Sequence, residues 1–136
     1  MHLLDTNVLS ELRRRDRTHR NVARWAKRVD PTELFLSAIT ILEIEAGTLS
    51  VARRDSAAGA VLRTWIDTKL LPAFEGRILP VDTAVAMRCA RLHVPDPRGE
   101  RDALIAATAL VHGLTLVTRN TADFQGMGLT LLNPWL

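Results

Sequence analysis

The stretch Leu3-Leu4-Asp5-Thr6-Asn7-Val8-Leu9 contains the unit from which the rest of the fold is built. Its apolar start, His2 to Leu4, has the character of a short buried strand, and polar residues follow it directly. Thr6 or Asn7 is expected to cap a helix, because apolar residues then recur at helical spacing. A strand that passes into a helix through a polar turn is typical of α/β proteins.

The same unit recurs along the chain. The expected strands are His2 to Leu4, Leu34 to Leu36, Arg77 to Val81, Leu114 to Thr118 and Leu129 to Leu132. Six helices are expected. The first follows the Thr6–Asn7 cap, the second runs from Thr18 to Val29, and the third begins at Ser37. The other three run from Ser56 to Leu71, from Asp82 or Thr83 to His93, and from Arg101 to Val111. Pro72 is expected to end one helix, and Pro80 favours an edge position for its strand. This alternation predicts an α/β fold of three layers, with a mostly parallel sheet of about five strands between helices.

Length and composition exclude several classes of protein. The chain has 136 residues, of which 47% are hydrophobic and 24% charged, so we expect one domain, residues 1–136, with its own core. Cys89 is the only cysteine, which rules out an internal disulfide, and we expect it in the core. The longest apolar run, Ala103 to Val111, is too short to span a membrane, and no signal peptide is visible. A cytoplasmic location is therefore expected.

Positive charge is concentrated near the start of the chain. Residues 1–30 hold eight basic and four acidic residues, whereas residues 31–136 hold ten basic and eleven acidic ones. A bound polyanion such as nucleic acid is one explanation of this pattern, and a solvated helix face is the simpler one, which the charge pattern alone favours.

Three acids occupy positions suited to chemistry. Asp5 follows the first strand, Glu43 lies within an apolar helix pattern, and Asp102 lies in the first turn of another helix. Each also has a structural role available, as a cap, a solvent-facing residue or a partner of the helix dipole. Because ligands bind at the carboxyl ends of parallel strands, the three acids together predict an oxygen-lined pocket for Mg²⁺ or Mn²⁺. The four histidines have no paired spacing, so a zinc site is not expected.

At these residues the sequence resembles the PIN domain, and in particular the VapC-type toxins of toxin–antitoxin operons, including their FitB-like branch. The resemblance rests on five stretches in order: Leu3 to Glu11, Leu36 to Glu43 with Gly47, Gly76 to Pro80 followed by Asp102 to Ala109, Leu116 to Phe124, and Asn133 to Trp135. It implies a Mg²⁺-dependent endoribonuclease, with Mn²⁺ as a substitute, that is inhibited by a cognate antitoxin.

The resemblance also implies roles for individual residues. It makes Asp5, Glu43 and Asp102 the catalytic and metal-binding acids, with Asp123 as a fourth acid acting through water, because the turn before it carries neutral Asn120. Neighbouring polar residues are expected to support these acids: Thr6, Asn7, Ser37, Thr40, Thr118 and Asn120. Four arginines are expected to bind RNA phosphates beside the acids: Arg13, Arg14, Arg15 and Arg17.

Partner surfaces are expected on two helical segments. The helix that opens at Ser37 is expected to pack through Ile39, Leu42, Ala46 and Leu49. With the segment from Val61 to Leu71, it has more apolar positions than one buried face requires. A homodimer and an antitoxin helix both fit, with operator DNA reached only through the antitoxin. Two other functions remain open: a non-catalytic module of a DNA-binding antitoxin complex, and a DNA-directed nuclease of the same fold.

Overall fold

The computed structural model describes residues 1–136 and contains a five-stranded parallel sheet in the order β3-β2-β1-β4-β5. The strands are β1 (His2–Leu4), β2 (Leu34–Ser37), β3 (Ile78–Leu79), β4 (Thr115–Val117) and β5 (Leu131–Leu132). The expected α/β class, strand count and parallel pairing are confirmed. The strand with Pro80 beside it lies at an edge, as expected, because proline has no amide to donate to a second neighbour.

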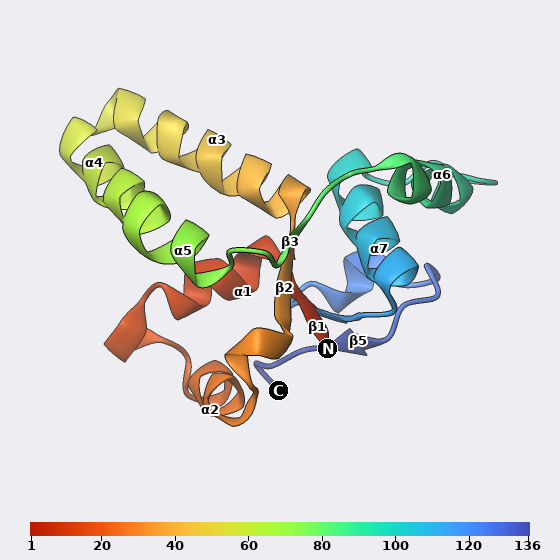
Figure 1. Ribbon diagram of the computed structural model, residues 1–136, viewed down its shortest axis with the longest axis horizontal. Coiled ribbons are helices and arrows are strands. Elements are labelled where there is room, and N and C mark those ends of the chain that lie inside the picture. The colour runs from red at the N-terminus through yellow and green to blue at the C-terminus, as the bar shows by residue number, and fades with distance from the viewer.

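Helices cover both faces of the sheet. They are α1 (Thr6–Leu12), α2 (Arg20–Arg28), α3 (Ala38–Arg54), α4 (Ser56–Trp65), α5 (Leu71–Ala73), α6 (Thr83–Leu92) and α7 (Glu100–His112). Figure 1 shows the sheet in the middle, with α1 to α5 on one side and α6 and α7 on the other. None of these helices combines the length and apolar character needed to cross a membrane.

The two-residue period of the strands divides the core between the layers. Leu4 and Val117 point into the cluster formed with α1, α2 and the segment after α4. Leu3 and Leu116, their neighbours in sequence, point into the cluster formed with α7. Successive side chains of a strand face opposite sides, so one short strand supplies both halves of the core. Cys89 packs in a smaller cluster between α6 and α7, as expected for a core residue.

The first helix is capped not by Thr6 or Asn7 but by Asp5, for which capping was the alternative structural role. Asp5 caps α1, and its Oδ1 accepts a hydrogen bond from the Thr6 amide at 2.8 Å. Thr6 and Asn7 both lie inside the helix. The helix begins as soon as β1 ends, so the first of three consecutive polar residues takes the cap position.

Pro72 does not end the helical segment that precedes it. After α4, a π-helical turn over Ile66–Leu70 continues into α5, which contains Pro72. The proline lies in the first turn of α5, where a missing backbone donor is tolerated. The expected stop at Leu71 was therefore wrong, and the chain remains helical to Ala73.

The expected packing face of α3 was partly wrong. Ile39 is buried, but Leu42 and Leu49 are 46% and 58% exposed. Figure 1 shows why: α3 and α4 form a hairpin that extends away from the sheet. Only the start of α3 reaches the core, while its later turns pair with α4, where Arg63 and Glu45 form an ion pair.

Candidate functional site

Asp5 lies at the carboxyl end of the central strand and is only 7% exposed. Its Oδ2 accepts hydrogen bonds from the Thr118 hydroxyl at 2.8 Å and from the Asn7 amide group at 3.2 Å. Thr118 reaches it because β1 and β4 are hydrogen-bonded neighbours. Burial raises the pKa of Asp5, although the hydrogen bonds from Thr118, Thr6 and Asn7 oppose this effect.

Asp102 faces the other predicted acids from the first turn of α7. Burial raises the pKa of Asp102, and the negative charges of Asp5, Asp123 and Glu43 raise it further. The positive charge of Arg98 acts in the opposite direction. Four acids from separate segments therefore share one electrostatic environment at the carboxyl edge of the sheet.

Glu43 is held between a hydrogen bond and an arginine. Its Oε1 accepts from the Thr6 hydroxyl at 2.7 Å, and its Oε2 lies 3.9 Å from Nη1 of Arg101. Thr6 thus links α3 to the turn that begins at Asp5. The alternative role of Glu43, as a solvent-facing helix residue without function in the site, does not fit this half-buried position.

Asp123 lies in the 3-10 turn Thr121–Phe124, close enough to raise the pKa values of both Asp5 and Asp102. Arg98 anchors this turn through hydrogen bonds from Nη2 to the carbonyl oxygens of Asp123, at 3.3 Å, and Gln125, at 2.8 Å. The Asn120 backbone amide donates to the Thr118 hydroxyl at 3.0 Å, so that turn is tied to the oxygen that holds Asp5.

The remaining supporting residues differ in their surroundings. Ser37 accepts a hydrogen bond from the Ile39 amide at 3.0 Å and thereby caps α3. The hydroxyl of Thr40 is buried and has no hydrogen-bond partner. Neither side chain has a polar contact with the acids, so their support for the site stays a prediction.

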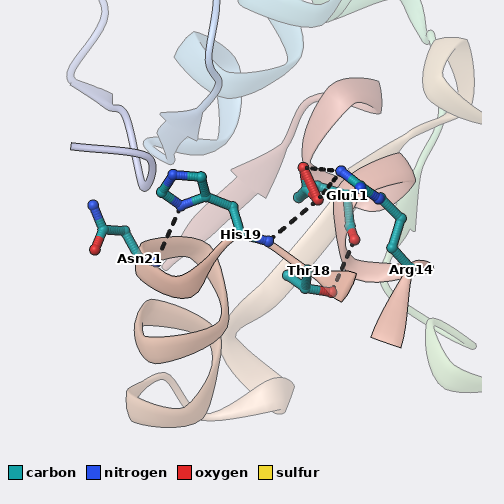
Figure 2. Close-up of polar contacts among 5 residues, drawn as sticks. All are labelled: Glu11, Arg14, Thr18, His19 and Asn21. Carbon is teal, nitrogen blue, oxygen red and sulfur yellow. Dashed lines mark hydrogen bonds and ion pairs between the residues drawn. The ribbon is translucent and has the colours of Figure 1, made fainter. Parts of the chain in front are cut away.

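The four arginines expected to bind RNA divide into two groups. Arg13 lines a groove of about 240 Å³ together with Thr6 and Glu43. Arg14 instead pairs with the buried Glu11, as Figure 2 shows. Arg15 and Arg17 are exposed in a 3-10 turn beyond the end of α1, whereas Asp5 caps its start. Of the four, only Arg13 lines a groove shared with one of the acids, Glu43.

Sequence reasoning missed Arg98 and Arg101. Arg98 approaches Asp102 and Asp123, and Arg101 approaches Glu43. The sequence feature that could have identified them is their closeness to Asp102, since both lie within four residues of it.

The acids fit a hard divalent cation. They offer only oxygen ligands, which Mg²⁺ and Mn²⁺ prefer, and a cation among them offsets their burial and mutual repulsion. The ligand oxygens of Asp5, Glu43 and Asp102 do not all lie within 4.8 Å of one another. An ion here is therefore expected to contact one or two carboxylates directly, with water between it and the others.

A second cluster contains metal-ligand residue types, namely Cys89, His93 and Glu100. Nε2 of His93 lies 3.7 Å from Sγ of Cys89 and 3.5 Å from a carboxylate oxygen of Glu100. The Arg98 amide donates to Nδ1 of His93 at 3.0 Å, which places the proton of a neutral ring on Nε2. With Nε2 protonated, the ring has no free lone pair for a metal, and the cluster instead ties α6 to α7.

Comparison with known proteins agrees with the fold described above. The family model of the PIN domain matches residues 2–128. The chain belongs to the PIN-domain family. Within it, the chain is 34% identical over 140 residues to VapC ribonuclease Y4jK of Sinorhizobium fredii, covering 99% of this chain and 98% of that protein.

Further relatives and solved structures extend the likeness. Toxin FitB of Neisseria gonorrhoeae is 37% identical to this chain over 140 residues, and the alignment covers 99% of each chain. The crystal structure of FitAcB from the same organism matches with a TM-score of 0.90 at 35% identity, again covering 99% of each chain. A toxin–antitoxin complex from Klebsiella pneumoniae matches with a TM-score of 0.71 at 28% identity, covering 98% of each chain. The resemblance seen in the sequence is thus confirmed, and with it the expected fold.

Proposed function

We propose that this PIN-domain chain is a metal-dependent endoribonuclease that acts as the toxin of a toxin–antitoxin pair. The observation that carries this proposal is the cluster of Asp5, Glu43, Asp102 and Asp123, because the burial of Asp5 and Asp102 and the repulsion that they experience from the other acids favour a bound cation. The full-length likeness to a VapC ribonuclease supports RNA as the substrate. The likeness to FitB supports the toxin role, and a cytoplasmic location follows from such a role.

The proposed cofactor is Mg²⁺, with Mn²⁺ as a substitute, held by Asp5, Asp102 and Glu43. One or two of these carboxylates bind it directly, and the remainder, like Asp123, act through water. Such an ion supplies a Lewis acid that activates water and offsets negative charge on the phosphodiester. The oxygen-only ligand set supports this choice over zinc, which prefers nitrogen and sulfur.

The chain's own residues position the acids and attract the RNA. Thr118 and Asn7 fix the Asp5 carboxylate, and Thr6 fixes Glu43. Arg13 beside Glu43 and Arg101 on α7 place positive charge at the rim, where phosphate groups of the substrate are attracted. These contacts hold the RNA backbone without reading its sequence.

The proposed protein partners are a cognate antitoxin and a second copy of the chain. The toxin–antitoxin complex among the similar structures supports the antitoxin, and operator DNA is expected to be reached only through it. Leu42 and Leu49 on α3 and Val61 on α4 leave exposed apolar surface for such partners.

A cleavage assay on purified protein tests the proposal. Labelled RNA and single-stranded DNA of equivalent sequence are incubated with the chain in Mg²⁺, in Mn²⁺ and in EDTA. We expect RNA cleavage in either metal, none in EDTA, and none by Asp5→Asn, because that change removes a central negative charge.

Asp16→Asn is the matched control, since Asp16 is exposed in the turn beyond α1, after the end of that helix opposite to Asp5. It should cut RNA at the wild-type rate. Cleavage by a folded Asp5→Asn protein at that rate would contradict the site. Cutting of DNA alone would favour the DNA-directed nuclease, and absence of metal binding in calorimetry would favour the non-catalytic module.

A further inference from the structure

We propose that a pocket between α2 and the C-terminal segment binds a backbone phosphate of the RNA strand, outside the cleavage site. The inference rests on the proposed ribonuclease function. The pocket has a volume of about 210 Å³. Its polar lining comes from Asn21, Arg24 and Arg28 of α2 and from Asn133, and the rest from Trp25, Leu132, Pro134 and Leu136.

Both walls of the pocket are fixed by hydrogen bonds. Figure 2 shows the start of α2 held by Glu11, whose carboxylate accepts from the His19 amide at 3.4 Å. One residue into α2, the Asn21 side chain donates to the Trp135 carbonyl at 2.7 Å. The Trp135 amide in turn donates to Oδ1 of Asn133 at 2.9 Å. Because these amide side chains are occupied in building the walls, they leave ligand binding to the arginines.

Arg24 and Arg28 carry positive charge that is not paired with any Asp or Glu side chain. They lie one helical turn apart on α2 and line the same pocket. No Asp or Glu carboxylate forms an ion pair with either guanidinium, in contrast to Arg14 and Arg63, which are both paired. Two unpaired guanidinium groups in a concave site match the charge and the several oxygen acceptors of a phosphate.

Arg119 and the C-terminal segment connect the pocket to the acidic site. Thr118 binds Asp5, and the next residue, Arg119, places its guanidinium 5.3 Å from the centre of the Trp135 ring. The Asn133 side chain donates to the Arg119 carbonyl at 3.4 Å. Positive charge therefore runs from the carboxyl edge of β4, over Arg119, to α2. This continuity with a phosphodiester-cleaving edge favours an RNA backbone as the occupant over a free anion or an acidic protein segment.

A binding assay with matched variants tests the pocket. Fluorescence anisotropy of labelled RNA is measured in EDTA, which prevents cleavage, with one RNA of about 20 nucleotides and one of about four. The variant R24A/R28A removes the two pocket arginines. The control R20A/K27A removes two positive charges from the same helix at residues that do not line the pocket.

We expect R24A/R28A to bind the longer RNA about tenfold more weakly than R20A/K27A does. The slope of log affinity against log salt should also become shallower by about 0.7 for each RNA phosphate that the variant no longer binds. The short RNA, which cannot reach from the acids to the pocket, should bind both variants alike. Thermal unfolding checks that both variants remain folded.

Equal affinity of the two variants for the longer RNA would overturn the inference. Weakened antitoxin binding with unchanged RNA binding would also overturn it, because it would assign the pocket to an acidic protein segment. Wild-type cleavage of the same RNA in Mg²⁺ is measured in parallel. If the wild type cuts but the variants bind alike, only the pocket fails; if the variants differ but the wild type never cuts, only the nuclease proposal fails.

Discussion

Burial raises the pKa values of Asp5 and Asp102, which has a direct consequence for stability. A carboxylic acid with a raised pKa in the folded state binds protons more readily there than in the unfolded state. Stability contributed by that group therefore falls as the pH rises from its ordinary pKa of 3.8 through the raised value. At neutral pH without metal, both carboxylates destabilise the fold that positions them.

Replacing Asp102 by Asn should therefore abolish RNA cleavage while stabilising the metal-free protein. The amide keeps the shape of the side chain and removes the repulsion from Asp5, Asp123 and Glu43. We expect the Tm at pH 8 to rise by about 3 °C, and the gain to shrink near pH 4, where the wild-type acid is increasingly protonated. Circular dichroism melts in EDTA measure both values. A variant that melts below the wild type at pH 8 would show that Asp102 is stabilising instead, through the helix dipole.

Thr118 positions Asp5 from a strand that is distant in sequence. Thr118→Val removes the hydroxyl that donates to Oδ2 of Asp5 and leaves the side-chain shape nearly unchanged. We expect cleavage to slow by about tenfold or more, as is typical when a metal ligand is deprived of its hydrogen-bond partner. Thr118→Ser keeps the hydroxyl and should restore most of the rate in the same RNA assay. Equal rates for the Val and Ser variants would mean that the hydroxyl does not position Asp5.

At the scale of elements, the α3–α4 hairpin depends on a close approach at one glycine. A Cβ atom added to Gly59 would lie 2.5 Å from Cβ of Ala52 in α3, so the two helices approach too closely for any larger residue. Gly47, also helical, has no atom within 4 Å of such a Cβ. The two glycines therefore form a natural pair for comparison.

Gly59→Ala should lower the free energy of unfolding by about 1–3 kcal/mol, because the hairpin must separate to admit the methyl group. Gly47→Ala should raise it by about 0.5–1 kcal/mol, since alanine favours a helix and has room there. Urea denaturation measures both changes. A stabilising Gly59→Ala substitution would show that the hairpin adjusts freely.

The helices between strands also determine which basic residues reach the acids. Helix α1 has seven residues with Asp5 at its start, so all four arginines from Arg13 to Arg17 follow its far end, and only Arg13 shares a groove with Glu43 of α3. Helix α7 instead begins at the site, which brings Arg101 in its first turn to Glu43 and places Arg98 just before the helix. The direction in which each helix runs relative to the acids, rather than the density of positive charge along the sequence, decides which arginines flank the site.

At the scale of the whole molecule, metal binding and folding should be coupled. Ions that bind the folded acids and not the unfolded chain stabilise the protein by mass action. We expect millimolar Mg²⁺ to raise the Tm at pH 8 and to have a smaller effect near pH 4, where protons compete for the raised-pKa acids. Melts of wild type and Asp5→Asn, with and without Mg²⁺, measure this coupling. An equal shift in both proteins would place the ion elsewhere.

Much of the fold follows from local sequence. The alternation of apolar strands with amphipathic helices predicts the parallel sheet. It can be recognised locally, because the hydrophobic pattern of a strand and that of a helix are each visible within about ten residues. The positions of Asp5 and Asp102 at element ends are visible in the same way, since strand and helix boundaries have polar signals, and Glu43 stands out as an acid within an apolar helix pattern. Boundaries themselves were less accurate, as the cap at Asp5 and the helical path through Pro72 show.

Contacts between distant segments required the tertiary structure. Thr118 holds Asp5 across 113 residues, and Asn21 holds Trp135 across 114, because strand order and helix placement bring those segments together. The exposure of Leu42 and Leu49 likewise depends on how far the α3–α4 hairpin extends beyond the sheet. The sequence by itself determined the α/β class and the candidate acids, because those depend on neighbours along the chain. Only the tertiary structure decided which arginines face the acids and which face the C-terminal pocket, because that depends on the direction in which each helix leaves the sheet.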